Sequence, residues 1–525
     1  MKEFSKLSGY KINIRKTELL PIDKSINLEN CKEFTIQTKN IKYLGCYIST
    51  DKTQLYKDNY LPLIKGLKQD TQRWSELKIN LIGRINLFKM IWLPKFLYIF
   101  QTISITPPKA FFNEVNSILG SFIWANKAQR VKRKLLYHSR GEGGLNLPNM
   151  EYYHTSAQMY YIDHIVNNTN EDPWLEIENH QIQPNNLLSA LFSKNKLKPM
   201  NCVINSTVQA WKKIKKSTGY EIGIPTHIHI WNNPSINIQK AKINWEIWKE
   251  SGIGKLSDII QNERVISFQE LKKKFDIKDA ECFKYLQLKN WVSQNLDLKN
   301  YRITEIGKIL CKKEETKKRV IGETYSILIK AESSDELLQP VFNKWNRDLN
   351  RVDAGKIWKE CLQMTNKVTT NENLRLIQYK LMTRIYYSRD KIHKFDSSLS
   401  DKCLKCAQTD SLIHSFWHCE KIIKVWKKID RWLSKMCKYN MLFSPEICIF
   451  QKVGKQKYPR GWQILFSSLV YKKLILQNWK NKEAPSFEKW KSLMKFYLSI
   501  EESMAIDSNK KKQFSTVWEP IYKNL

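Results

Sequence analysis

The sequence predicts a mainly α-helical protein with a small α/β segment at its N-terminus. The hydrophobic fraction of 42%, with 12% aromatic residues, is ample for globular cores. From about residue 55 onward the apolar residues recur at helical spacing, whereas β-rich runs are concentrated in the first fifty residues. A chain of 525 residues is long enough for several domains, each with its own core.

Residues 1–52 form the predicted α/β segment. An amphipathic start is followed by two β-rich runs, FTIQT at 34–38 and IKYLGCYIS at 41–49. Lys39 and Asn40 lie between these runs and predict a hairpin turn.

Residues 53–150 form the second predicted domain, which is helical. Leu81, Ile85, Phe88 and Trp92 keep a 3.6-residue period, and Pro94 is expected to kink or end that helix. Residues 127–140 then contain six Lys or Arg and no acid, which predicts a basic surface. Its expected nucleic-acid contacts are Lys132, Arg133 and Lys134. The glycine-rich segment 141–144 indicates a turn.

Two further helical domains are predicted, at 151–335 and 336–525. The boundary is placed in AESSDELLQ at 331–339, because a charged, Ser-rich segment there precedes a new helical pattern. After Cys419, one face of a predicted helix is apolar and the opposite face carries lysines. The apolar residues are Ile422, Trp426, Ile429, Leu433 and Met436. This pattern predicts a helix that packs on a core and leaves a basic surface.

Charge indicates the class of partner. The chain has 88 Lys and Arg against 51 Asp and Glu, a net charge of +37. Such an excess favours a polyanionic partner, nucleic acid above all. An anionic membrane is the competing partner, but no run of 18 apolar residues and no signal-peptide pattern occurs. We therefore expect no membrane association and a cytoplasmic or nuclear location, with which eleven scattered cysteines agree.

A metal site is predicted at 403–419. Cys403, Cys406, His414 and Cys419 follow the spacing C-x2-C-x7-H-x4-C and offer three thiolates and one imidazole. These are the ligands of a structural Zn²⁺ site, in which the protein fills all four positions. His418 is not expected to be a ligand, because it stands directly beside Cys419. The alternative is a group of ordinary buried cysteines.

A stretch rich in cations and aromatic residues, 374–394, precedes the cysteines. Its predicted nucleic-acid-binding residues are Arg375, Lys380, Arg384, Tyr386 and Arg389. Cations can neutralise phosphates while tyrosine rings stack on unpaired bases. The alternative is a buried helix whose tyrosines pack in a core and whose lysines are only solvated.

Other motifs give little support for catalysis. His227 and His229 form an H-x-H pair, but no further metal ligand follows at a recognisable spacing, so an exposed strand is the preferred interpretation. Neither G-x-x-x-x-G-K-[ST] nor H-E-x-x-H occurs.

Several segments, in order, resemble the C-terminal part of the reverse transcriptase polyprotein of LINE-type (non-LTR) retrotransposons. FSKLSGYKINIRKT (4–17) resembles the end of the palm, and IKYLGCYIS (41–49) resembles the primer-grip hairpin. The residues from Trp74 to Tyr98 resemble the thumb, and GGLNLP (143–148) resembles its continuation. IQYKLMTRIYYS (377–388) with the following cysteines resembles the C-terminal zinc-knuckle region.

The resemblance implies a palm remnant with a hairpin at 1–52, a thumb at 53–150, a connecting domain at 151–335 and a zinc-knuckle domain at 336–525. It implies binding of RNA, RNA–DNA hybrid or single-stranded nucleic acid. The hairpin, with Tyr43 and Gly45, would hold a primer end by backbone contact, although Gly45 could serve strand twist alone. The thumb would place Arg84, Lys89 and Lys95 along phosphates.

The chain departs from the family at the catalytic centre. The family's polymerase needs a palm aspartate and an F/Y-A-D-D pair, and no A-D-D occurs here. Phosphoryl transfer would lack the carboxylates that hold its metal ions, so we expect binding without polymerisation. The family's N-terminal endonuclease is expected to be missing as well, and Met1 is then expected to be an internal methionine of a 5′-truncated copy or of a partial gene model. The alternatives are a zinc-stabilised protein-interaction module and a non-functional relic.

Overall fold

A computed structural model describes residues 2–11, 13–22, 28, 31, 33–167, 173–181, 187, 191, 201–219, 230–231, 233, 236–239, 241–298, 304–310, 319–349, 353–437, 443–452 and 459–525. The structure is 67% helix and 4% strand, which confirms the mainly α prediction. Among the described residues, no helix combines the length and the apolar composition needed to cross a bilayer.

The chain forms two compact units, each assembled from separate segments. Unit 1 contains Met1–Glu76, Lys89–Leu119 and Pro148–Glu332. Unit 2 contains Leu77–Phe88, Gly120–Leu147 and Ser333–Leu525. The division after Glu332 falls inside the segment 331–339, where Ser333 caps a new helix. The four-domain division of the sequence stays a prediction.

The predicted hairpin turn at Lys39–Asn40 is wrong, because the strands on either side of it do not pair with each other. The chain begins with α1 (Lys2–Ser8). Strand β2 (Thr35–Ile36) follows and pairs in parallel with β1 (Glu18–Leu19). The hairpin consists of β3 (Ile41–Tyr43) and β4 (Cys46–Ile48). Its turn residues Leu44 and Gly45 both have positive φ, 46° and 86°, as a type I′ turn requires.

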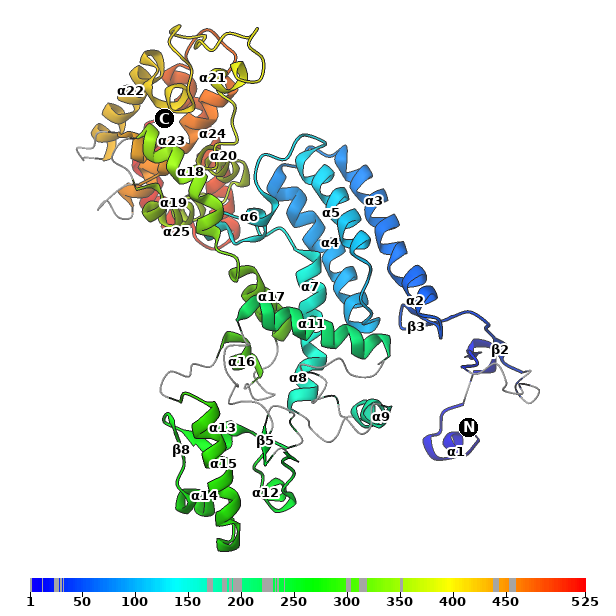
Figure 1. The fold of residues 1–525 in the computed structure, drawn as a ribbon. Coiled ribbons are helices and arrows are strands. Elements are labelled where there is room, and N and C mark those ends of the chain that lie inside the picture. Colours follow the sequence, from blue (N-terminus) through cyan, green and yellow to red (C-terminus); the bar gives the residue numbers. More distant parts are fainter. Residues whose placement is uncertain are drawn as a thin grey trace. The chain divides into compact units, whose positions relative to one another are not determined.

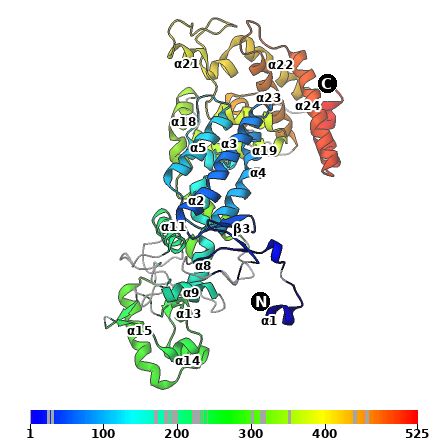
Figure 2. The same ribbon diagram turned by 90° about the vertical axis from the view of Figure 1, so that its right-hand side faces the viewer.

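Long helices follow the hairpin (Figures 1 and 2). They are α2 (Lys52–Asn59), α3 (Leu61–Ser75), α4 (Leu81–Thr102) and α5 (Lys109–Trp124). Within unit 1 they pack around Tyr60, whose ring lies 6.1 Å from that of Phe100 and 5.4 Å from that of Phe111. Pro94 does not end α4, which continues to Thr102. Helices α4 and α5 each contribute residues to both units.

Two more cores complete unit 1. The first lies among α7 (Met150–Ala157), α8 (Met159–Asn167), α9 (Pro173–Gln181), α11 (Cys202–Thr218), α16 (Glu305–Leu310) and α17 (Val320–Lys330). The second surrounds Trp248, whose indole N–H donates to the buried Glu281 carboxylate at 2.9 Å. Its elements are β5 (Asn237–Ile238), β6 (Ala241–Lys242), α12 (Glu246–Glu250), α13 (Leu256–Ile259), β7 (Ile260–Gln261), β8 (Arg264–Val265), α14 (Phe268–Phe275) and α15 (Cys282–Asn295).

Unit 2 is built around one nearly buried helix, α23 (Arg460–Gln477). Its neighbours include α19 (Ala354–Val368), α20 (Glu372–Met382), α24 (Phe487–Asp507) and α25 (Lys511–Tyr522). The remaining helices are α6 (Arg133–Tyr137), α18 (Ser334–Asp348), α21 (Arg389–His393) and α22 (Glu420–Cys437). Because α23 is apolar on most sides, it is stable only when other helices cover those sides.

Unit 1 has a buried histidine that should make its stability depend on pH. His154 is 5% exposed, its Nε2–H donates to the Ile105 carbonyl at 2.9 Å, and Phe100 and Phe112 pack edge-on against the ring. Burial lowers the pKa of His154 from 6.5 to about 4. Between these values the unfolded chain binds a proton that the folded chain does not, so stability is full above pH 6.5 and falls as the pH falls toward 4.

We expect this histidine to cost unit 1 up to about 3 kcal/mol at pH 4 relative to pH 7, at 1.36 kcal/mol per pKa unit. Hydrogen exchange of the α7 amides at both pH values measures the loss, and His154→Gln should reduce it. His180→Gln, at an exposed position, is the control. An unchanged pH dependence in His154→Gln would contradict the assignment.

Candidate metal centre and basic residues

The first two cysteines of the candidate metal centre lie on a tight loop. Cys403 N–H donates to the Gln408 carbonyl at 2.7 Å, and Ala407 N–H donates to the Cys403 carbonyl at 2.9 Å. Lys402 and Thr409 form a single antiparallel bridge that closes the loop. Ala407 has a φ of 60°, which reverses the chain after Cys406. The loop also brings the Lys405 N–H to 3.4 Å from the Cys403 sulfur.

The other two ligands lie at the ends of one π-helical turn, His414–His418. Cys419 N–H donates to the His414 carbonyl at 3.0 Å, the five-residue bond that defines such a turn. The turn places both side chains toward the cysteine loop. Helix α22 begins at the next residue, and its first turn is anchored by N–H groups of Ile422 and Ile423 on the Cys419 carbonyl.

The four ligand atoms of Cys403, Cys406, His414 and Cys419 lie within 4.8 Å of one another. The Cys406 sulfur lies 3.2 Å from His414 Nε2. Zinc bonds of about 2.3 Å to sulfur and 2.0–2.1 Å to nitrogen give tetrahedral edges of roughly 3.5–3.8 Å, so the atoms are close to a ligand geometry. This group could therefore hold one metal ion. His418 is exposed and does not belong to it, as predicted.

Burial favours the metal-binding form of His414 but not that of Cys406. It lowers the pKa of His414, which favours the neutral imidazole that binds metals. It raises the pKa of the Cys406 thiol, because a buried thiolate loses its hydration. A metal would therefore have to displace the Cys406 proton when it binds.

The cysteine loop is held against the residues that follow α23, within unit 2. The Lys405 ammonium group donates to the carbonyls of Asn478 and Asn481, at 3.0 and 2.9 Å, beyond the end of α23. Phe416 packs on Trp479, with 5.5 Å between ring centroids. Lys405 therefore helps to hold the cysteine loop on the end of a helix.

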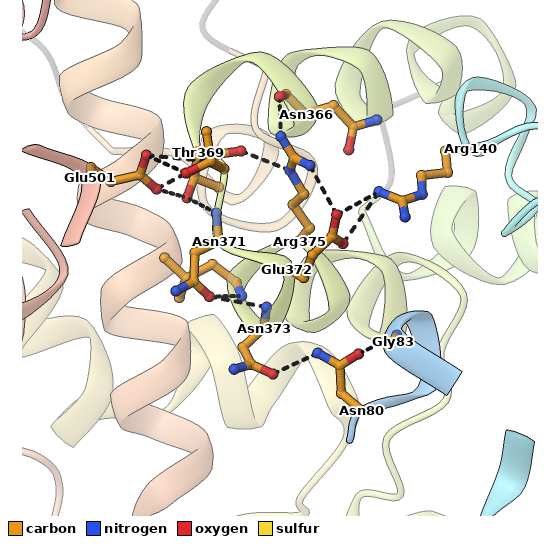
Figure 3. A network of polar contacts seen from close by, with 12 residues as sticks. Asn80, Gly83, Arg140, Asn366, Thr369, Asn371, Glu372, Asn373, Arg375 and Glu501 are labelled. Atoms are coloured by element: carbon orange, nitrogen blue, oxygen red, sulfur yellow. Dashed lines mark hydrogen bonds and ion pairs between the residues drawn. The ribbon is translucent and has the colours of Figure 1, made fainter. Parts of the chain in front are cut away.

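Three arginines predicted to contact phosphates have partners within unit 2. Figure 3 shows Arg375 donating to the carbonyls of Thr369 and Asn366, at 2.7 and 2.8 Å, and pairing with Glu372 at 3.1 Å. In the same network Arg140 pairs with Glu372. All three nitrogens of the Arg375 guanidinium have partners within the protein, which gives Arg375 a structural role. A phosphate contact by Arg375 stays a prediction.

Arg384 and Arg84 are engaged in a similar way. Arg384 pairs with Asp348 at 2.6 Å and stacks over the Trp345 ring. Arg84 is 7% exposed and donates to the Ile79 and Phe122 carbonyls at 3.0 and 2.6 Å. Burial also lowers the pKa of Arg84. Both guanidinium groups therefore have partners within the protein, and nucleic-acid binding by Arg84 and Arg384 stays a prediction.

Tyr386 also has a structural role. Its ring lies 6.1 Å from that of Phe416 and 6.4 Å from that of Trp479, so it belongs to the aromatic cluster beside the metal centre. Burial raises the pKa of its hydroxyl. Packing in a core, the alternative considered for these tyrosines, accounts for Tyr386. Arg389, at the start of α21, is half-buried and donates through Nε to the Ser400 carbonyl at 3.1 Å.

The remaining predicted residues are more accessible. Tyr43 is exposed in the hairpin, and the turn conformation alone accounts for Gly45, because its φ of 86° disfavours other residues. Lys95 is exposed with its ammonium group 4.3 Å from the Trp92 ring centroid. Lys132 and Lys134 are exposed, and Lys89 and Arg133 are half-buried. Binding by these residues stays a prediction. His227 and His229 lie outside the described residues.

One cluster of cations could not be assembled from the sequence. Lys380, from the 374–394 stretch, lines the same pocket as Arg84, together with Lys127 and Arg130. Lys127 and Arg130 belong to the acid-free segment 127–140, and that composition was the only available signal. No protein-family model matches the chain.

The metal centre generates a paired test. Cys419→Ser removes a ligand that is 0% exposed, whereas Cys361→Ser changes a cysteine that is 1% exposed and is not a ligand. With zinc at about 1,000 times its Kd, the bound metal adds about 4 kcal/mol of stability, roughly 8–16 °C for a unit of this size. We expect EDTA to lower the Tm of wild type and Cys361→Ser by this amount, with no effect on Cys419→Ser.

Metal content by elemental mass spectrometry accompanies these unfolding curves. One equivalent of zinc is expected in wild type and Cys361→Ser, and none in Cys419→Ser. Equal EDTA sensitivity in all three proteins would contradict a metal centre at these residues.

Proposed function

We propose that this chain binds RNA, RNA–DNA hybrid or single-stranded nucleic acid through the phosphate backbone, with one structural Zn²⁺ in its C-terminal unit. The observation that carries the proposal is the exposed face of α22. Helix α22 buries Ile422, Trp426, Ile429 and Leu433. Its opposite side, which we call the basic face of α22, exposes Lys421, Lys424, Lys427, Lys428, Arg431 and Lys435.

The basic face of α22 suits a polyanion better than a protein groove. Its exposed side chains are dominated by cations, with one exposed acid, Glu420, at the helix start. A row of cations on a rigid helix can follow successive phosphates without reading sequence. The net charge of +37 extends the same preference to the whole chain.

Zinc is the metal that the donor set favours. Three thiolates and one imidazole are the soft and borderline ligands of structural zinc sites. Four protein ligands leave no open position for a reacting water, so the ion would serve folding and not hydrolysis. Because α22 starts directly after Cys419, a bound ion would also fix where the basic face begins.

Resemblance to LINE-type reverse transcriptases supports the choice of nucleic acid. The resembling segments occur in the family's order, from residue 4 to about residue 430. Membership in that family is itself part of the proposal. Over the residues given we propose binding without polymerisation, because the sequence has no A-D-D to hold catalytic metal ions.

The proposal is tested by removing charge from the basic face of α22. Lys424, Lys427 and Lys428 are changed together to Gln, and the matched control changes three exposed lysines elsewhere, Lys482, Lys489 and Lys495. Each lost phosphate contact reduces the slope of log K against log salt by about 0.7–0.9, so we expect a reduction of roughly 2 in the first variant only.

Fluorescence anisotropy of a labelled single-stranded RNA and of an RNA–DNA hybrid, at several salt concentrations, measures the slopes. Equal slopes for the two triple variants would contradict the role of α22. Zinc-loaded protein without salt-dependent binding would favour the protein-interaction alternative. Primer extension by the purified chain would contradict the absence of polymerisation.

A further inference from the structure

A pocket of about 260 Å³ lies within unit 2, between three segments that are distant in the sequence. Its walls come from the start of α4, from the end of α5 with the following loop, and from the end of α20. The larger apolar lining residues are Ile79, Leu81, Ile123, Trp124 and Ile385. The function proposed above does not use this pocket.

The charged lining of this pocket is entirely cationic. Arg84, Lys127, Arg130 and Lys380 line it, and its described lining includes no carboxylate. Burial lowers the pKa of Lys380, and the nearby charges of Arg130 and Lys127 lower it further. Four like charges line this pocket, and their repulsion is screened where Lys127 and Arg130 are exposed to solvent. An anion in the pocket would reduce the repulsion that remains around Lys380 and Arg84.

Two of the cations are held in fixed positions by backbone carbonyls. Arg84 is bound by Ile79 and Phe122, as described above. Arg130 Nη1 donates to the Ile385 carbonyl at 3.1 Å, and its guanidinium lies 4.0 Å from the Tyr387 ring centroid. Carbonyls carry only partial charge, so they orient the guanidinium groups and leave the pocket positive.

The other two cations can turn toward a ligand. Within the described part of the chain, the ammonium groups of Lys127 and Lys380 take part in no ion pair with a carboxylate. Lysine ammonium groups bind phosphate as point charges on flexible stems, whereas a fixed guanidinium sets the position of the anion. The pocket thus has both kinds of phosphate-binding group, in apolar surroundings that strengthen charge interactions.

We propose that this pocket binds a phosphate group of the nucleic-acid strand, with Lys380, Lys127 and Arg130 as the contacting residues and Arg84 as a buried positive charge behind them. The inference rests on the proposed function for the source of the phosphate. It adds a defined subsite, separate from the basic face of α22, at which one phosphate would be held.

Lysine acylation of the full chain, followed by peptide mass spectrometry, tests the pocket with inorganic pyrophosphate alone. The lowered pKa of Lys380 makes its amine reactive, and an anion in the pocket should shield it. At ten times Kd we expect acylation of Lys380 to be about ten-fold slower, by simple mass action. Lys127 should be protected as well, and the exposed Lys495 should not be.

RNA affinity against salt tests the source of the phosphate. Lys380→Gln should reduce the salt slope by about 0.7–0.9, the value for one phosphate contact. Lys380→Arg keeps the charge and Lys495→Gln removes a charge elsewhere, so both should retain the wild-type slope. Circular dichroism of all three variants confirms that a changed slope does not come from unfolding.

The two proposals fail in different ways. RNA binding that is unaffected by Lys380→Gln, with no protection of Lys380 by pyrophosphate, would overturn the subsite and leave the proposed function standing. Absence of RNA binding in the wild-type chain would overturn the proposed function. If the wild-type chain binds no RNA but pyrophosphate still protects Lys380, the pocket binds an anion. That result would contradict a nucleic-acid strand as the source of its phosphate.

Discussion

The excess of cations over acids is the constraint on which this structure depends. With 88 basic and 51 acidic side chains, cations outnumber carboxylates by 37, so one-to-one ion pairs cannot neutralise all of them. Most can stay in water, but a cation inside a unit needs another partner, because burial without one is costly. The protein uses backbone carbonyls near helix C-termini, where the helix dipole is negative. Backbone carbonyls at helix ends thus bind some of the cations, in addition to the carboxylates that form ion pairs.

Several cations follow this rule, from the buried Arg84 to the half-buried Arg375 and Lys405 and the exposed Arg130. Arg84 binds the Phe122 carbonyl near the end of α5, Arg375 binds carbonyls at the end of α19, and Lys405 binds carbonyls beyond the end of α23. Arg130 binds the carbonyl of Ile385, three residues after α20 ends. The bonds of Arg84, Arg130 and Lys405 join segments that are distant in the sequence, and the bonds of Arg375 hold the connection between α19 and α20. The same side chains that give the chain its charge therefore assemble unit 2.

The rule explains what the sequence could and could not predict. Periodicity predicted the mainly α fold and the buried face of α22, because both depend on local pattern. Spacing predicted the cluster of Cys403, Cys406, His414 and Cys419, because metal ligands must converge within one short segment. Arg84 and Arg375 could not be told from surface cations, since which arginine meets the end of which helix is decided by tertiary packing. The β-rich runs misplaced a hairpin turn at Lys39–Asn40 for a related reason: Leu44 adopts a positive φ that its type does not suggest. The resemblance placed a hairpin in residues 41–49, where β3 and β4 pair.

The metal centre and the basic pocket use complementary electrostatics. Three thiolates on one divalent ion leave a net charge of −1, so a metal-loaded centre would lie next to the lysine-rich start of α22 as a local anion. That charge would stabilise Lys421 and Lys424 in the first turn of α22. The pocket has no such internal anion, since its partners are only carbonyl dipoles. A metal-loaded centre would thus carry its own countercharge, whereas the described lining of the pocket offers its cations only carbonyl dipoles.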